Sequence, residues 1–312
     1  MSSRCFVVVM VPVSIVATVL LATVPVMGQA YLTESSCMDS TPAVFHPCAL
    51  EAAKTFTPPR TPDGQPDLGG FWRTRIAGGS HEDVEEHPRT PDDSGGPTMV
   101  VDTPDGKVPI QPWADVRRRE NVRRYLQQEA GCMLSGVPAT MYMTSLYQFL
   151  VTPDYVVIQS EEHHAYRIIP LHERPPVGKD MRLWQGDSRG HWDGNTLVIE
   201  TTNQAARGWL DQRGRFLTDE ARIVERLTLI DANTIHYAAT VDDENVYTRP
   251  WTLVSVFRRN AEEWVDFWEE ACHENNKELM EIFLTDFEVY PGITAREARQ
   301  LREAWEEQEA QR

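Results

Sequence analysis

Positive charge is scarce in this 312-residue sequence. Lysine and arginine number 30 against 47 aspartates and glutamates, so the formal net charge is −17. A chain this acidic lacks the clustered cations that neutralise phosphate groups, and we expect neither nucleic acid nor an anionic lipid surface as a partner. Hydrophobic residues make up 41% of the chain, which is enough for a substantial core.

The motifs of several enzyme classes are also missing. The sequence has no G-x-S-x-G nucleophile elbow, no H-E-x-x-H zinc motif, no P-loop and no G-x-G-x-x-G in a βαβ setting. Residues 186–190 contain two glycines, but no phosphate-binding helix is expected after them. The sequence therefore assigns no cofactor, and the class of reaction or ligand has to come from other features.

Residues 1–30 are predicted to be a secretory signal. Arg4 supplies the positive start, residues 6–27 are apolar and uncharged, and the small residues Gly28 and Ala30 suit cleavage after Ala30. We expect an exported protein, periplasmic or extracellular, with no membrane segment beyond the signal. The apolar run is also long enough to remain as an anchor, and that alternative describes an envelope-anchored interaction protein.

Four cysteines follow the signal: Cys37, Cys48, Cys132 and Cys272. An even number in an exported chain favours two disulfides, for which three pairings are possible. We favour Cys37 with Cys48 as a local loop and Cys132 with Cys272 as a long-range link. A metal site is the weaker interpretation because the chain has no C-x-x-C spacing.

Short β-rich segments separated by polar turns dominate the chain after residue 66. We expect a disulfide-stapled irregular arm at 31–66, a β-barrel domain at 67–285 and a C-terminal helical tail at 286–312. Strands are predicted at residues 68–75, 146–151, 155–160, 165–171, 196–202, 223–230, 234–241, 251–258 and 264–268. The pattern predicts a mainly β fold, an antiparallel meander that forms a barrel or a strongly curved sheet, because no helical segments separate these strands.

Helices are expected at residues 115–128, 275–284 and from Thr294 onward. The first has one narrow apolar stripe surrounded by five arginines, so it is either a solvated helix or an anion site. Thr294 and Glu297 form a capping box for the last helix. Ala298, Leu301 and Trp305 are expected to dock that helix on the barrel.

Three places could carry acid–base chemistry. The first is the turn Glu-Glu-His-His at residues 161–164. Glu161 and His164 could act as acid and base there, or Glu161, His163 and His164 could hold a divalent metal. The alternative is a solvated polar turn. Glu225 shares an apolar strand face, so it is either a structural partner of Arg167 or Arg249 or a raised-pKa acid or base.

His273 follows Cys272 at a predicted strand–helix junction. A histidine near a helix N-terminus stays neutral, as a general base must, although it could also only hydrogen-bond the barrel rim. Arg167, Trp184, Tyr237 and Trp251 are the residues we expect around a bound ligand.

Residues 70–72 read Gly-Phe-Trp, a Gly-x-Trp triplet that resembles the opening strand of lipocalins and other calycin barrels. There the glycine permits close backbone approach and the tryptophan fills the closed end of the barrel. Longer stretches resemble a group of exported bacterial proteins for which no activity is known; they lie at residues 66–72, 132–138, 161–170, 186–201, 247–252 and 271–276. The resemblance implies export and one integral domain, and the chain departs from the group at Asn275, where a glycine is usual.

These observations favour an exported lipocalin-like protein that binds a small, largely apolar molecule inside a β-barrel. The alternative is an exported hydrolase, lyase or isomerase of a small molecule or glycan, using Glu161, His164, Glu225 and His273. The binding hypothesis predicts an enclosed apolar pocket, and the enzyme hypothesis predicts that Glu225 and His273 face one cavity.

Overall fold

The computed structural model of the protein describes residues 33–74, 82–91, 93–143, 145–262, 264–268, 270–272, 274, 276–278, 281, 285 and 288–312. The predicted signal at residues 1–30, His273 and most of the predicted helix at 275–284 lie outside the described residues and stay predictions. Within the described part of the chain, no helix is both long enough and apolar enough to cross a membrane.

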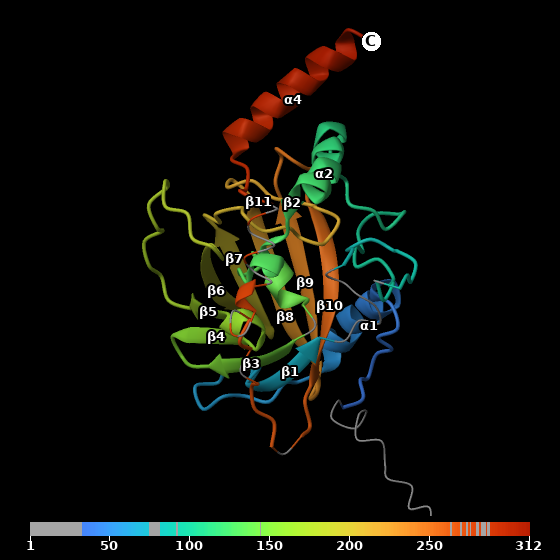
Figure 1. The fold of residues 1–312 in the computed structure, drawn as a ribbon. Helices are drawn as coiled ribbons and strands as arrows, with labels where there is room; N and C mark the ends of the chain where they lie inside the picture. The colour runs from blue at the N-terminus through green and yellow to red at the C-terminus, as the bar shows by residue number, and fades with distance from the viewer. Residues whose placement is uncertain are drawn as a thin grey trace, which may run out of the picture. The chain divides into compact units, whose positions relative to one another are not determined.

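One antiparallel sheet of nine strands forms the body of the protein and is nearly closed into a barrel (Figure 1). Its strands are β1 (Gly70–Thr74), β3 (Leu146–Val151), β4 (Tyr155–Ser160), β5 (Tyr166–Pro170), β6 (Asp187–Asp193), β7 (Thr196–Thr202), β8 (Arg222–Asp231), β9 (Thr234–Asp242) and β10 (Trp251–Arg259). In space they run β5-β4-β3-β1-β10-β9-β8-β7-β6. The predicted fold class, a mainly β antiparallel barrel or strongly curved sheet, is confirmed.

Strand β1 lies between β3 and β10, so the sheet consists of two meanders that the first strand joins. Trp72 in β1 is fully buried and its Nε1 donates to the Leu68 carbonyl at 2.9 Å. The Arg259 guanidinium lies over the Trp72 ring, 4.2 Å from its centroid, and donates to the Gly69 carbonyl. Gly70 leaves room for this arginine, because a Cβ there would lie 2.7 Å from the guanidinium.

Two strand predictions were wrong. Residues 187–193, for which no strand was predicted, form β6 and pair with β7 along its full length. The expected strand at 264–268 is irregular where the structure describes it, and the Trp264 and Trp268 side chains are 88% and 82% exposed. Aromatic content alone had suggested that strand, but its backbone has no ladder partner among the described residues.

Helices α1 (Pro42–Thr55), α2 (Pro112–Arg124) and α4 (Ala295–Ala310) accompany the sheet. Helix α1 lies in the arm that we expected to be irregular. It is capped by Thr41, whose side chain accepts from the Val44 amide. Its buried face, Phe45 and Ala49, packs on outward-facing side chains of β8, β9 and β10. This cover explains why β9 and β10 are buried on both faces instead of alternating.

The other two helices differ from expectation only at their ends. Helix α2 begins three residues earlier than predicted, at Pro112, and ends where Tyr125 enters the short parallel pair β2 (Tyr125–Leu126) with β11 (Glu288–Val289). The capping box at the start of α4 is confirmed. Ala298 is buried and Trp305 packs on the core, whereas Leu301 points to solvent, so the docking stripe is narrower than predicted.

Both predicted disulfides are present. Cys37 pairs with Cys48 and Cys132 with Cys272, with Cα–Cα distances of 5.9 and 5.8 Å. The long-range bridge joins the 3₁₀ region η1 (Gln128–Gly131) to the segment after β10. Two disulfides fit an oxidising, exported environment.

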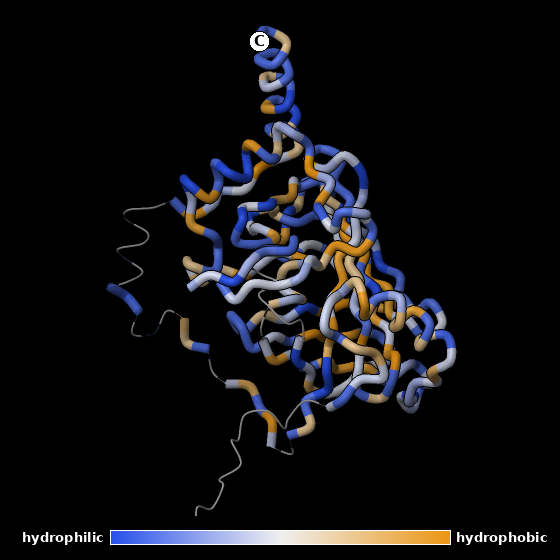
Figure 2. Tube along the Cα trace, turned by 90° about the vertical axis from the view of Figure 1, so that its right-hand side faces the viewer, coloured by the Kyte–Doolittle hydropathy of each residue, from blue (hydrophilic) through white to orange (hydrophobic). Residues whose placement is uncertain are grey.

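The barrel interior is filled by the protein's own side chains. Hydrophobic segments concentrate in the region of the sheet (Figure 2). The largest fully buried side chains are Trp72, Trp251, Tyr142, Tyr147, Tyr237, Tyr247, Tyr290, Phe45, Phe149, Phe216, Phe257 and Leu68. The free edges of β5 and β6 face each other at the opening of the sheet. Gly190 in β6 permits their contact, because a Cβ there would lie 2.9 Å from both Ile169 and Leu171.

Candidate functional site at one end of the barrel

Glu225 and Arg167 form a buried ion pair inside the barrel, which we call the interior pair. Glu225 is fully buried on the predicted face of β8, and its carboxylate accepts from Arg167 Nη1 at 2.9 Å and from the Tyr237 hydroxyl at 3.0 Å. Burial opposes the charge on Arg167, but the adjacent Glu225 carboxylate raises the pKa of Arg167 above its ordinary value. The other suggested partner, Arg249, instead pairs with Asp102.

The interior pair also joins the two ends of the sheet. Arg167 lies on edge strand β5, and its Nη2 donates to Ser188 Oγ on β6 at 3.1 Å and to Thr201 Oγ1 on β7 at 3.3 Å. The buried Glu225 carboxylate therefore has hydrogen-bond donors from both Arg167 and Tyr237. The geometry matches the structural alternative that the sequence left open for Glu225.

The end of the barrel where β4 turns into β5 carries a cavity of about 160 Å³, which we call the end pocket. It is lined by Gln159, Ser160, Glu161, His164, Ala165, Tyr166, Phe267 and Trp268. The hairpin β4–β5 brings the first six residues together, as predicted for the turn. Phe267 and Trp268 come from the irregular segment after β10 and close one side.

Glu161 holds that irregular segment in place. Its carboxylate accepts from the Trp268 backbone amide at 3.0 Å. Phe267 packs edge-on against Phe71 of β1 with ring centroids 5.6 Å apart. Trp268 remains 82% exposed, so one of the two aromatic side chains on this wall lies mostly in solvent.

The backbone of the turn is strained at two consecutive residues. His163 and His164 have φ values of 55° and 48°, in the left-handed region that residues with a Cβ adopt at a cost. Strained residues of this kind cluster at binding and catalytic sites, where the surrounding structure enforces them. Here the strain directs the His164 side chain to the pocket wall.

Glu162 in the same turn has a pKa near neutrality. Burial, together with the negative charges of Glu129 and Glu270, raises its pKa to about 7. Burial also raises the pKa of Glu129. A carboxylic acid that exchanges its proton near pH 7 is a property of acid–base sites, although structural clusters also produce it.

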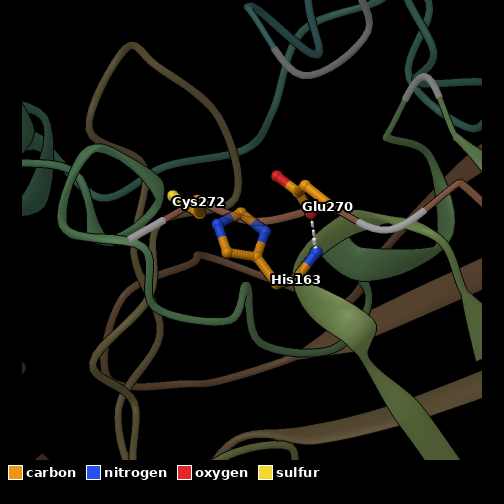
Figure 3. A group of neighbouring side chains, drawn as sticks. All are labelled: His163, Glu270 and Cys272. Atoms are coloured by element: carbon orange, nitrogen blue, oxygen red, sulfur yellow. Dashed lines mark hydrogen bonds between the residues drawn. The ribbon is translucent and has the colours of Figure 1, made fainter. Parts of the chain in front are cut away.

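His163 turns away from Glu161 and His164 toward the long-range disulfide. Its amide donates to the Glu270 carboxylate, and its ring lies beside Cys272 (Figure 3). One donor atom each from His163, Glu270 and Cys272 lies within 4.8 Å of the others. Cys272 is bonded to Cys132, so its sulfur is no thiolate and the group lacks a third metal ligand. Among the described residues, Glu161, His163 and His164 do not form the metal group that the turn suggested.

The four predicted ligand residues lie elsewhere. Arg167 and Tyr237 belong to the interior pair, and Trp251 is buried with its ring edge-on to Tyr247. Trp184 donates its indole N–H to the Leu134 carbonyl. None of the four lines the end pocket, and their role in binding stays a prediction, as does that of His273.

A second, more open hollow of about 610 Å³ lies at the opening between β5 and β6. It is lined by Leu171, His172, Glu173, Arg174, Pro175, Arg189, Gly190 and His191. Both of its arginines bind the buried Asp187 carboxylate. Their charge is partly neutralised, and no aromatic wall encloses the space.

Several residues of the end pocket were missed by the sequence interpretation. Tyr166, Phe267 and Trp268 were assigned to strands, and only the aromatic richness of 264–268 marked that segment as unusual. The charges of Glu129 and Glu270 act on Glu162 from other segments of the chain, the second of them more than a hundred residues away in sequence, and no local pattern reveals them. No protein-family model matches this chain, and no curated protein matches it either.

Proposed function

We propose that this exported protein binds a small, partly apolar molecule in the end pocket, against the Tyr166, Phe267 and Trp268 side chains. The observation that supports this most is an 82% exposed tryptophan on the wall of a cavity that also holds a carboxylate and an imidazole. Apolar lining with a few convergent polar groups is typical of ligand sites.

The dimensions of the pocket restrict the ligand. A volume of about 160 Å³ corresponds to roughly five water molecules in the liquid. We therefore expect a small ring or short chain that stacks on Trp268 and carries one group able to hydrogen-bond to Glu161 or His164. The filled interior makes the end pocket a better location for the ligand than the centre of the barrel.

Comparing the molecules that copurify with three forms of the protein tests this proposal. Mass spectrometry of wild type, Trp268→Ala and Trp264→Ala is informative because Trp264 is equally exposed and lies on the same segment, outside the pocket lining. We expect one small molecule to copurify with wild type and with Trp264→Ala and to be depleted about fivefold with Trp268→Ala, since an aromatic contact contributes about 1 kcal/mol. Equal recovery from all three forms, or none from any, would contradict the proposal.

A second candidate function is acid–base catalysis at the same place, and the Glu162 pKa of about 7 with the strained histidines favours it. In this case His164 or Glu161 would transfer a proton of the bound molecule, and Glu162 would set the pH range. Incubating the identified ligand with wild type and with His164→Gln tests it. A product mass that forms with wild type and is lost in the variant, while the ligand still binds, supports catalysis; an unchanged ligand assigns the site to binding alone.

A further inference from the structure

A second cluster of ionisable groups lies far from the end pocket in sequence, in the loop between β1 and α2. Glu82, His87 and Asp93 each place one donor atom within 4.8 Å of the others. We call them the loop triad. The His87 side chain is 4% exposed, those of Glu82 and Asp93 14% and 9%. Two carboxylates next to a buried imidazole call for compensating positive charge, and Arg213 supplies one such charge to Asp93.

The orientation of the His87 ring is fixed by the backbone. Its Nδ1 lies 2.8 Å from the Glu85 carbonyl oxygen, and a carbonyl only accepts, so Nδ1 carries a proton. In the neutral ring the lone pair is then on Nε2. That atom is buried and makes no hydrogen bond. It lies 3.0 Å from Asp93 Oδ1 and 4.0 Å from Glu82 Oε2, so a lone pair is directed at two negatively charged oxygens.

The two carboxylates are positioned by further contacts. Arg213 Nη2 donates to Asp93 Oδ2 at 2.7 Å, and the Gly95 amide donates to Asp93 Oδ1 at 2.8 Å. The Ser94 hydroxyl donates to Glu82 Oε2 at 2.9 Å. Such outer contacts hold metal ligands in proteins, and the bond from an imidazole N–H to a carbonyl is among the commonest.

We propose that the loop triad binds one divalent transition-metal ion, with Zn²⁺ as the reference ion. His87 supplies Nε2, and Asp93 and Glu82 supply one oxygen each. Ligands about 2.1 Å from a common ion lie roughly 3–4 Å apart, and the two separations from Nε2 fall in that range. Three protein ligands leave a fourth position for water or a small anion. A ligand set of one imidazole nitrogen and two carboxylate oxygens favours Zn²⁺ and similar transition-metal ions over Ca²⁺ or Mg²⁺.

The competing account is a proton in place of the metal. A protonated His87 would pair with Asp93 across the 3.0 Å contact, and no ion would bind. The two accounts differ in whether the intact protein takes up metal in a defined ratio, and that ratio can be measured directly.

Isothermal titration of the untagged, chelator-treated full chain with ZnCl₂ tests the proposal. We expect one ion per chain and a rise in Tm on binding. His87→Ala should weaken Zn²⁺ binding by at least tenfold. Even the loss of a residue that only hydrogen-bonds to a metal ligand weakens metal binding tenfold to a hundredfold. Glu82→Gln, which changes a partly exposed side chain and spares the fold, should weaken it less. His191→Ala is the matched control, because this exposed histidine lies at the β5–β6 opening.

Cobalt substitution adds a readout of geometry. Co²⁺ bound to wild type should give visible absorption of a low-coordinate site, and His87→Ala should abolish it while His163→Ala leaves it intact. The proposal is overturned if wild type takes up no stoichiometric metal, if His87→Ala binds as tightly as wild type, or if His163→Ala is the variant that loses the ion.

Discussion

Two clusters of ionisable groups share strand β5 and its turn yet are built differently. The interior pair, Arg167 with Glu225, is fully buried and its carboxylate accepts from three side-chain N–H and O–H donors. The turn before β5 contributes to the end pocket. In that turn Glu162 lies near other carboxylates and two histidines have strained backbones. In the interior pair opposite charges lie together and are buried, whereas in the turn beside the end pocket like charges lie together and are partly open to solvent.

The difference shows how burial should be interpreted for this protein. A buried carboxylate opposite an arginine is part of the structure, because the pair neutralises itself and fixes the positions of β5 and β8. A carboxylate beside other carboxylates retains its proton to near neutrality and is free to exchange it. A pKa shifted by an adjacent opposite charge therefore indicates a structural role for the group. A pKa shifted by adjacent like charges marks the group as a candidate for a functional site.

The largest loss of unfolding free energy should come from removing the Cys132–Cys272 disulfide. In the chain-entropy model, the Cys132–Cys272 bridge with its 140-residue separation contributes about 5 kcal/mol, and Cys37–Cys48 with a separation of 11 contributes about 3 kcal/mol. Paired Cys→Ser variants in guanidinium unfolding should show this order. Only the loss of Cys132–Cys272 should also abolish ligand recovery; if both variants retain the ligand, the end pocket does not depend on this bridge.

Arg167→Met should lower the free energy of unfolding by about 3–5 kcal/mol, because it leaves Glu225 buried without its cationic partner. Arg167→Met combined with Glu225→Gln should regain most of that loss, since the glutamine is neutral and still accepts from Tyr237. Denaturant unfolding of wild type, the single and the double variant measures both. A double variant as unstable as the single one would show that packing of the arginine, and not its charge, supports β5.

The pH dependence of stability should separate the two clusters. The folded state raises the pKa of Glu162 from 4.5 to about 7, so it holds this proton more tightly than the unfolded chain does. The associated stability is complete below about pH 4.5 and is lost as the pH rises to about 7, by up to about 3 kcal/mol. Glu162→Gln should flatten the curve in that window, and the exposed Glu173→Gln should not. A curve unchanged in Glu162→Gln would contradict the assignment.

The smallest effect is expected from Ser188→Ala. It removes one of the hydroxyl groups that accept from Arg167 inside the barrel, and a lost neutral partner costs about 1 kcal/mol. Ligand recovery should be unchanged, because Ser188 lies outside the end pocket lining. If Ser188→Ala were as stable as wild type but no longer recovered the ligand, ligand binding would depend on the interior pair and not on the end pocket.

Local patterns predicted much of the fold. Alternating apolar residues and short polar turns identified β3, β4 and β7 with their observed bounds, and the face shared by Glu225 followed from the period of two. The turn of Glu161 and His164 was found because four charged or ionisable residues interrupt two strands. The predicted export and the even number of cysteines favoured two disulfides, and the pairing preferred among the three possible ones is the pairing observed.

Other features escaped because their causes are not local. Strand β6 has polar and glycine residues, and its pairing with β7 overrides their weak strand propensity. Helix α1 is stabilised by packing on the outer face of the sheet. The loop triad was not predicted at all, since Glu82, His87 and Asp93 sit in a segment whose only visible character was turn-forming residues.

By itself the sequence determined that this chain is acidic, β-rich and cross-linked, because charge, periodicity and cysteine count act over short distances or on the whole chain. Only the tertiary structure decided which carboxylate meets an arginine and which meets other carboxylates. That distinction depends on the insertion of β1 between β3 and β10 and on the near closure of the sheet, which bring distant segments within a few ångströms. At that range the local dielectric and the neighbouring charges fix the protonation of each group.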